Sequence, residues 1–203
     1  MRASTTRTIR LLSAARFLML AGLALSWSAR GASAEEIDTL GGRLPVTSGM
    51  RCYSGTFDKG HMAAHPKQRI TSIALAISSV RTSGELRLWP YVMMVRLKGE
   101  KAALWQTETC EFNEAGALRC IVACDGGHFT LSAPETGSGL RLELGDHYTL
   151  QGGCGDDRKP VVLSATTEEP AYTLDAKDMK ACRSQFRTSR KASEVLREIG
   201  RNR

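Results

Sequence analysis

The sequence lacks the short motifs that mark the common enzyme classes. It has no Gly-x-Ser-x-Gly elbow, no phosphate-binding glycine-rich loop and no Gly-x-Gly-x-x-Gly dinucleotide fingerprint. Ser138 stands between two glycines, but the segment TGSGL at 136–140 is typical of a loop between strands. The sequence therefore predicts a non-catalytic protein without a cofactor. A catalytic group assembled from residues distant in sequence is the alternative that it leaves open.

The sequence also lacks an apolar run long enough to cross a bilayer, which takes ~20 residues. The run FLMLAGLALSWSA at 17–29 is shorter, follows four arginines and precedes the small residues ASA at 32–34. This order is typical of a secretory signal peptide. No Arg-Arg pair precedes the apolar run, so twin-arginine export is not indicated. No cysteine lies at the cleavage point, so a lipid anchor is not indicated either. We predict that residues 1–34 are a signal peptide and that the mature chain is periplasmic or secreted. An uncleaved anchor is the alternative.

The sequence also lacks net positive charge in its central part, residues 35–182, although the whole chain has a net charge of +7. Residues 1–34 contribute five arginines and no acid, and residues 183–203 contribute a net +5, which leaves −3 for the body between them. A high isoelectric point often indicates nucleic acid as a partner. Here the positive charge is confined to the two ends, so we do not expect nucleic acid to bind.

No Cys-x-x-Cys pair occurs, although all six cysteines lie in the exported part of the chain. An even number of cysteines in an exported chain favours three disulfides over a metal site. Cys110 and Cys120 flank a hairpin loop and are one expected pair. Cys52 and Cys182 lie near the two ends of the domain and are the second, which leaves Cys124 and Cys154 as the third. In a simple meander, Cys154 would lie at the opposite end of the sheet from Cys124. The pairing therefore stays open.

Helical periodicity is scarce before the C-terminus, and alternation of apolar with polar residues dominates. In ITSIALAIS at 70–78, Ile73, Leu75 and Ile77 share one face. Pro90 predicts that the strand at 85–97 is an edge, bulged or broken there. The other expected strands are 103–112, 118–124, 128–132, 140–144, 147–151 and 161–166. About eight short strands predict a mainly β fold, an antiparallel meander that forms a small barrel or sandwich, with a short C-terminal helix.

The size, the export signal, the many short strands and the C-terminal helix resemble the architecture of lipocalin-like barrels. The resemblance is one of architecture alone, because the Gly-x-Trp motif expected near the first strand of that family is missing. Fold does not give function. The domain organisation that we predict is a lead-in segment at 35–50, a disulfide-stapled β domain at 51–182 and a basic amphipathic tail at 183–203.

Two short helices are expected at the end of the chain. Asp175 is a suitable cap for AKDMKAC, and Ser189 is a suitable cap for a helix over 189–200 that Gly200 ends. Within the second helix one apolar stripe is formed by Ala192, Val195, Leu196 and Ile199. A helix docked on the barrel is the favoured interpretation. A basic segment that contacts anionic lipid or a partner groove is the alternative.

The four histidines are the candidates for a metal site. His61 and His65 are four residues apart, but the glutamate of the metalloprotease motif is absent. Pro66 disfavours a helical conformation at His65, so a capped turn over 58–64 explains this segment without metal.

The other two histidines lie in a repeat, GGHFTL at 126–131 and GDHYTL at 145–150. We interpret each copy as a hairpin corner followed by a half-buried strand, with the histidine on the outer face. Glu143 would lie between His128 and His147, which makes these three weak candidates for a metal site.

The most specific hypothesis on function is that the barrel binds a small apolar ligand or an envelope component. Aromatic and methionine side chains suitable for lining an apolar cavity are present: Trp89, Tyr91, Met93, Met94 and Trp105. The same side chains also suit an ordinary core. Two alternatives are an envelope interaction module that acts through the 183–203 tail, and an exported metal-binding protein. The oligomeric state is not predicted.

Overall fold

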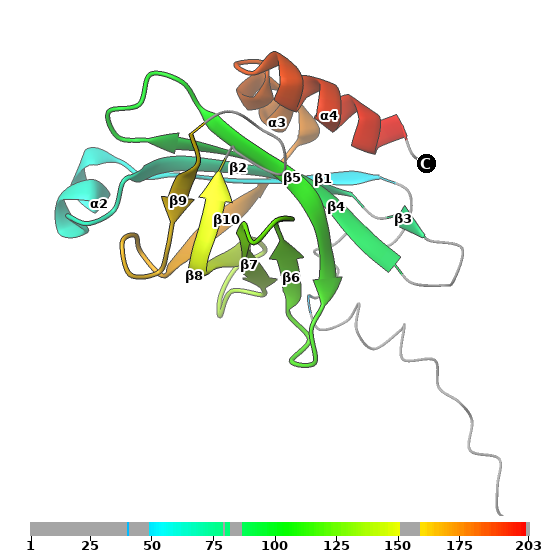
Figure 1. Ribbon diagram of the computed structural model, residues 1–203, viewed down its shortest axis with the longest axis horizontal. Helices are drawn as coiled ribbons and strands as arrows, with labels where there is room; N and C mark the ends of the chain where they lie inside the picture. The colour runs from blue at the N-terminus through cyan, green and yellow to red at the C-terminus, as the bar shows by residue number, and fades with distance from the viewer. Residues whose placement is uncertain (1–39, 41–48, 79, 82–86, 151–158, 202–203) are drawn as a thin grey trace, which may run out of the picture. The chain divides into compact units, whose positions relative to one another are not determined.

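The computed structural model describes residues 40, 49–78, 80–81, 87–150 and 159–201, all of which belong to one unit, 32–203. The predicted signal peptide and Cys154 lie outside the described residues. Within this unit, eight antiparallel strands close into a barrel, and the C-terminal helices pack on its outer face (Figure 1). The predicted fold class, a mainly β barrel with a short C-terminal helix, is confirmed.

The barrel follows a meander for most of its circumference and closes through its last strand. β10 pairs with both β8 and β1 and so completes the ring. Two short strands lie outside the ring, β3 (Val80–Arg81) beside β4 and β9 (Val161–Leu163) beside β8. The ring strands are β1 (Met50–Thr56), β2 (Ile70–Ser78), β4 (Arg87–Leu97), β5 (Leu104–Phe112), β6 (Leu118–Ile121), β7 (Gly127–Ser132), β8 (Leu140–Leu150) and β10 (Ala171–Lys177).

Alternation along each strand sends one set of side chains into the barrel. Ile73, Leu75 and Ile77 of β2 belong to the interior core, as their shared face predicts. Three interior rings, Tyr91, Phe129 and Tyr148, meet edge to face with centroids 5.2 and 5.1 Å apart. The interior is thus occupied by large apolar side chains from all around the ring.

β4 runs through Pro90 without a break, where the sequence predicts an edge, a bulge or an interruption. β2 pairs with β4 from Tyr91 onward, whereas β3 pairs with Leu88 and its neighbour Arg87. Pro90 therefore lies where β4 changes its neighbour on that side. The proline marks this change and not the end of the strand.

The expectation of two strands at 140–144 and 147–151 is wrong, because β8 is one continuous strand of 11 residues. GDH at 145–147 is a bulge, not a hairpin corner: the register with β7 shifts between the pairs Gly127↔Tyr148 and Phe129↔Leu144. The first copy of the repeat does follow a corner, in which Cys124 and Asp125 both have a φ of 57°. β8 thus ends beside that corner, and the Thr149 N–H donates to the Gly126 carbonyl at 2.8 Å.

Within the described ranges, three helices accompany the barrel, namely α2 (Lys59–Ala64), α3 (Met179–Phe186) and α4 (Arg190–Arg201). α3 begins at Asp178, whose carboxylate accepts from the Ala181 N–H at 2.7 Å, so the predicted cap at Asp175 is wrong. Ser189 accepts from the Ala192 N–H at 3.3 Å, and α4 continues one residue beyond Gly200. No helix among the described residues is long and apolar enough to cross a membrane.

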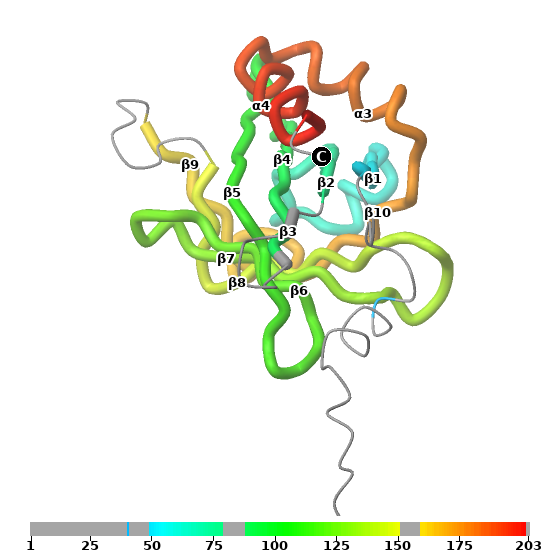
Figure 2. The backbone as a smooth tube through the Cα atoms, turned by 90° about the vertical axis from the view of Figure 1, so that its right-hand side faces the viewer, coloured from blue at the N-terminus to red at the C-terminus, as the bar shows by residue number. Residues whose placement is uncertain are grey.

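The C-terminal helices cover the outer face of β1, β2, β4 and β5, away from β6–β8 (Figure 2). That face is apolar where the helices lie. Cys52, Ala74, Ala76, Val92 and Met94 pack there against Phe186, Ala192, Leu196 and Ile199. The apolar stripe of α4 therefore packs on the barrel, as the favoured interpretation predicts, and is not free to contact lipid.

Disulfide bonding, predicted from the even number of cysteines, is confirmed. The bonds join Cys52 of β1 to Cys182 of α3, and Cys110 of β5 to Cys120 of β6, and both pairs coincide with pairings expected from sequence position. Cys124 is also disulfide-bonded. Its expected partner, Cys154, lies outside the described residues. The objection to that pair assumed a hairpin corner at 145–147, which the continuous strand β8 does not have, and the pair itself stays a prediction.

Candidate functional site

The C-terminal helices enclose a groove with the start of β1, which we call the arginine groove. It has a volume of about 760 Å³ and is lined by Met50, Met179, Arg183, Arg187, Ser193, Leu196, Arg197, Gly200 and Arg201. The groove arginines are four residues apart at each helix: Arg183 lies in α3 and Arg187 is its C-cap, whereas Arg197 and Arg201 both lie in α4. This spacing places each pair on one helix face. The two faces line the same groove from opposite sides.

The four arginines are not neutralised by the part of the chain that the structure describes. The ion pair on α4 joins Arg190 to Glu194 at 3.7 Å and includes none of the four. Arg197 donates from Nε to the Ser193 carbonyl at 3.3 Å, and the Ser193 hydroxyl donates to the Phe186 carbonyl at 2.7 Å. The groove therefore concentrates positive charge without a described acidic side chain to balance it.

Apart from Ser193 and Gly200, the remaining lining residues of the groove are apolar. Met50, Met179 and Leu196 come from β1, α3 and α4 respectively. Methionine adapts to ligands of varied shape because its side chain is unbranched and flexible. Guanidinium groups bind carboxylate and phosphate through paired hydrogen bonds. The lining contains no histidine, cysteine or carboxylate. This set of side chains has the charge and the apolar surface to hold an anion with an apolar part.

The Cys52–Cys182 bond joins two of the elements that line this groove, β1 and α3. Both cysteines are buried, with Cys52 two residues beyond Met50 and Cys182 one residue before Arg183. Their Cα atoms are 5.8 Å apart. The disulfide thus fixes α3 to β1 next to the groove.

The five candidate cavity residues do not share one face of the barrel. Trp89, Tyr91 and Met93 belong to the interior core, whereas Met94 and Trp105 lie on the outer face with the C-terminal helices. Two interior hydroxyls, of Tyr91 and Tyr148, lie 3.3 Å apart, and burial raises the pKa of both above the ordinary tyrosine value. The Trp89 indole N–H is buried and has no hydrogen-bond partner in the described structure.

Two of the three weak metal candidates, Glu143 and His147, are engaged in other contacts. Glu143 accepts from Arg141 Nε at 2.7 Å, and His147 Nε2 lies 2.7 Å from the Asp125 carbonyl, to which it donates. Partial burial, followed by the charge of Arg119, lowers the pKa of His128. Among the described residues, no three His, Cys, Asp or Glu side chains are grouped to hold a metal ion.

The other two histidines belong to α2 and its C-cap, and this helix is the capped turn that the sequence predicts. Asp58 caps the helix and His65 is its first residue beyond the C-terminus. The two imidazole rings nevertheless stack, with centroids 4.4 Å apart. His65 Nδ1 lies 2.7 Å from a Glu169 carboxylate oxygen, and His61 Nε2 lies 3.0 Å from the Gln68 amide oxygen. These contacts tie α2 to its surroundings.

Sequence reasoning found the positive charge of the tail but not the groove. The spacing of the arginines on the two helices was available as a signal, whereas the contribution of Met50, from the other end of the domain, was not. No known protein family, curated protein or solved structure matches this chain.

Proposed function

We propose that this protein is an exported, disulfide-bonded β-barrel that binds an anionic amphiphile of the cell envelope in the arginine groove, without transforming it. The observation that carries the proposal is the set of four arginines, unpaired with any described acid, around an apolar floor. Export rests on the signal-like pattern of residues 1–34. The disulfides support it, because they fit an extracellular or periplasmic location.

The charge of the groove determines the head of the ligand. Arginine recognises phosphate and carboxylate by fork-shaped hydrogen bonding, and a hydrogen bond to a charged group contributes roughly 1.5–3 kcal/mol. Four guanidinium groups around one groove favour a group with more than one anionic oxygen. A phosphate monoester meets this requirement best.

The floor of the groove determines the rest of the ligand. Met50, Met179 and Leu196 offer apolar surface below the charged rim, so an alkyl chain attached to the phosphate would be removed from water. The volume of about 760 Å³ lies within the range of roughly 300–1,000 Å³ that small-molecule sites occupy. The groove therefore suits a single amphiphile better than a membrane surface, since the apolar stripe of α4 is already buried against the barrel.

Replacing one groove arginine on each helix tests the proposal. In the variant Arg183→Gln with Arg197→Gln, we expect dodecyl phosphate below its micelle concentration to bind about 10–100-fold more weakly. Two charge-assisted hydrogen bonds are lost, and each contributes less than in a buried site because the arginines are exposed and screened by solvent. Isothermal titration calorimetry measures the change. Added salt should weaken binding to the unaltered protein, because the rim is open to solvent.

The matched control removes the same charge outside the groove. Lys180→Gln with Arg190→Gln also takes one cation from each helix, and neither residue lines the groove. This control should keep its affinity for dodecyl phosphate. Neutral dodecyl maltoside and inorganic phosphate should each bind more weakly than dodecyl phosphate, since each lacks half of the recognised chemistry. Equal losses in the two double variants, or equal binding of the maltoside, would contradict the proposal.

A further inference from the structure

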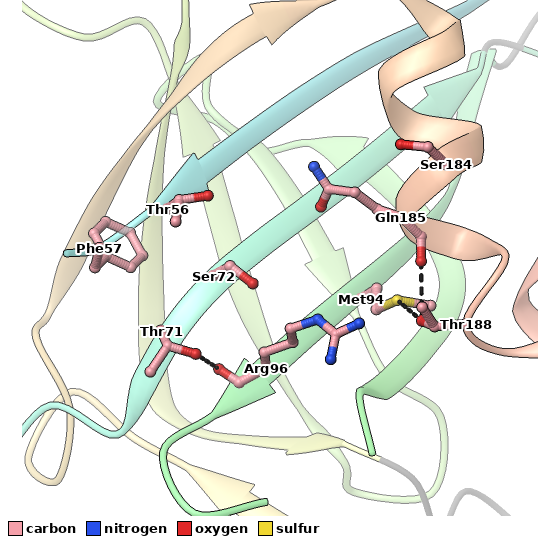
Figure 3. Close-up of a pocket in the computed structure, with 9 residues that line it drawn as sticks. All are labelled: Thr56, Phe57, Thr71, Ser72, Met94, Arg96, Ser184, Gln185 and Thr188. Carbon is pink, nitrogen blue, oxygen red and sulfur yellow. Dashed lines mark hydrogen bonds between the residues drawn. The ribbon is translucent and has the colours of Figure 1, made fainter. Parts of the chain in front are cut away.

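Helix α3 has a second groove on its opposite flank, which we call the polar groove. Its volume is about 470 Å³, and its lining comes from β1, β2, β4 and α3 (Figure 3). The lining residues are Thr56, Phe57, Thr71, Ser72, Met94, Arg96, Ser184, Gln185 and Thr188. At 100° per residue, α3 turns Met179 and Arg183 to one side of its buried Cys182–Phe186 face and Gln185 to the other. The two grooves are therefore separate sites.

The floor of the polar groove is a row of side chains across three neighbouring strands. Thr56 of β1 is the register partner of Ser72 of β2, which is in turn the partner of Arg96 of β4. The row lies on the outer face, because Ser72 alternates with Ala74 and Ala76 under the helices. Adjacent strands are ~5 Å apart, so the backbone positions of these three residues lie in line over ~10 Å.

The row belongs to a gradient of polarity along the outer face. The next row toward the helices is Ser54, Ala74 and Met94, and the one after it is Cys52, Ala76 and Val92. Apolar packing under α3 thus gives way to hydroxyls and one cation where the helix ends. The polar side chains lie beyond the area that the helices cover.

The hydroxyl groups around the groove divide into two kinds. Those of Thr71, Ser184 and Thr188 already donate to backbone carbonyls, so their oxygens are left as acceptors. Thr56 and Ser72, together with the Gln185 amide, have no side-chain partner among the described residues, which leaves them able to donate. A groove with donors and acceptors side by side complements a ligand whose own groups both donate and accept. Hydroxyl groups have this property.

Arg96 adds a single cation to this surface. Its guanidinium extends over the groove between Ser72 and Gln185 (Figure 3). No described acidic side chain forms an ion pair with it. Phe57, whose ring also contacts His61 and Tyr172, lies at one end of the groove and adds apolar surface there (Figure 3).

We propose that the polar groove binds a sugar acid, that is, a monosaccharide unit carrying one carboxylate. Arg96 holds the carboxylate, and the row of Thr56 and Ser72 with Gln185 of α3 holds the sugar hydroxyls. The site differs from the arginine groove in chemistry, because one cation among hydroxyls selects a polyol with a single negative charge.

The experiment compares glucuronate with glucose and with acetate, using chemical-shift changes in NMR spectra of the labelled full-length protein. We expect the affinity for glucuronate to be at least about tenfold higher than that for glucose or for acetate. Glucose lacks the carboxylate, and acetate lacks the hydroxyls. Arg96→Gln should reduce glucuronate binding to the level of glucose. Ser72→Val, which covers the floor with methyl groups, should weaken glucuronate and glucose alike.

The matched control is Lys98→Gln, which removes a cation from the chain just beyond β4 and outside the groove. It should leave glucuronate binding unchanged. The double variant Arg183→Gln with Arg197→Gln should also bind glucuronate normally, so failure of this proposal and failure of the proposed function are separate results. Equal binding of glucose and glucuronate, equal binding of acetate, or shifts confined to the arginine groove would overturn the assignment.

Discussion

At the scale of single residues, the repeated Gly-x-His-aromatic-Thr-Leu segment is a packing device. A glycine of each copy lies against the histidine of the other. A Cβ on Gly127 would overlap the His147 carbonyl, and a Cβ on Gly145 would come within 2.8 Å of the His128 ring and carbonyl. The two copies thus approach each other closely at the bulge of β8. The repeat needs no ligand to explain it.

Gly127→Ala is therefore expected to destabilise the protein more than another glycine substitution of the same conformational cost. Gly127 has a φ of 79° and Gly99 a φ of 84°, so each alanine should lose about 1–2 kcal/mol from the left-handed backbone. A Cβ on Gly99 would meet nothing within 4 Å. Displacement of the His147 strand should add about 1–3 kcal/mol at Gly127 alone. Urea unfolding measures the free energy of unfolding of both variants. Equal decreases would contradict the close approach of Gly127 to the His147 strand.

At the scale of elements, alternation in the sequence predicted the strands well where packing and turn chemistry agree. The loop at 113–116 is a hairpin because the Asn113 side chain accepts from the Ala115 and Ala117 N–H groups and Gly116 supplies a φ of 73°. GDH in β8 carries the same kind of turn residues. There the pairing with β7 on one side and with β9 and β10 on the other keeps the strand continuous.

Tertiary pairing also explains the helix start that the sequence placed wrongly. Asp175 and Asp178 are both suitable caps, but Asp175 is the register partner of Ser54 in β1. The ladder between β10 and β1 extends to Lys177 and delays the helix until Asp178. Local sequence contains two acceptable signals, and a strand more than 100 residues away decides between them.

The two described disulfides should differ in their contribution to stability. They are separated by 130 and by 10 residues in the sequence. In the chain-entropy account this corresponds to about 5 and about 3 kcal/mol respectively. We expect the variant Cys52→Ser with Cys182→Ser to lose more stability than Cys110→Ser with Cys120→Ser, by about 2 kcal/mol, in guanidinium unfolding. The reverse order would show that native packing and not loop length dominates.

At the scale of the whole barrel, the fold was predictable from sequence but the two grooves were only partly so. The arginine pairs on α3 and α4 follow from their spacing along each helix. Met50 and the row of Thr56, Ser72 and Arg96 become neighbours only through the register of β1, β2 and β4. Such cross-strand neighbours depend on turn lengths and bulges, which alternation does not reveal.

The C-terminal helix is expected to be part of the folded structure and not an appendage. Ending the chain after Thr188 removes Ala192, Leu196 and Ile199, which are all buried on the sheet. Burial of a large aliphatic side chain contributes roughly 1.5–3 kcal/mol, so the truncated protein should lose about 3–6 kcal/mol and bind a hydrophobic dye. Chemical denaturation measures the loss of stability. The control is the full chain with Arg190→Gln and Lys191→Gln. An unchanged midpoint would show that α4 contributes nothing to stability.

The closure of the barrel by β10 determines when the barrel can form during folding. β1 is complete at residue 56, yet it lacks one of its two neighbours until residues 171–177 arrive. A chain that emerges gradually, from a ribosome or through a translocation channel, therefore cannot close its barrel until nearly all of it has emerged. Until then one edge of β1 stays unpaired. The topology thus leaves the barrel open until its last ring strand is available.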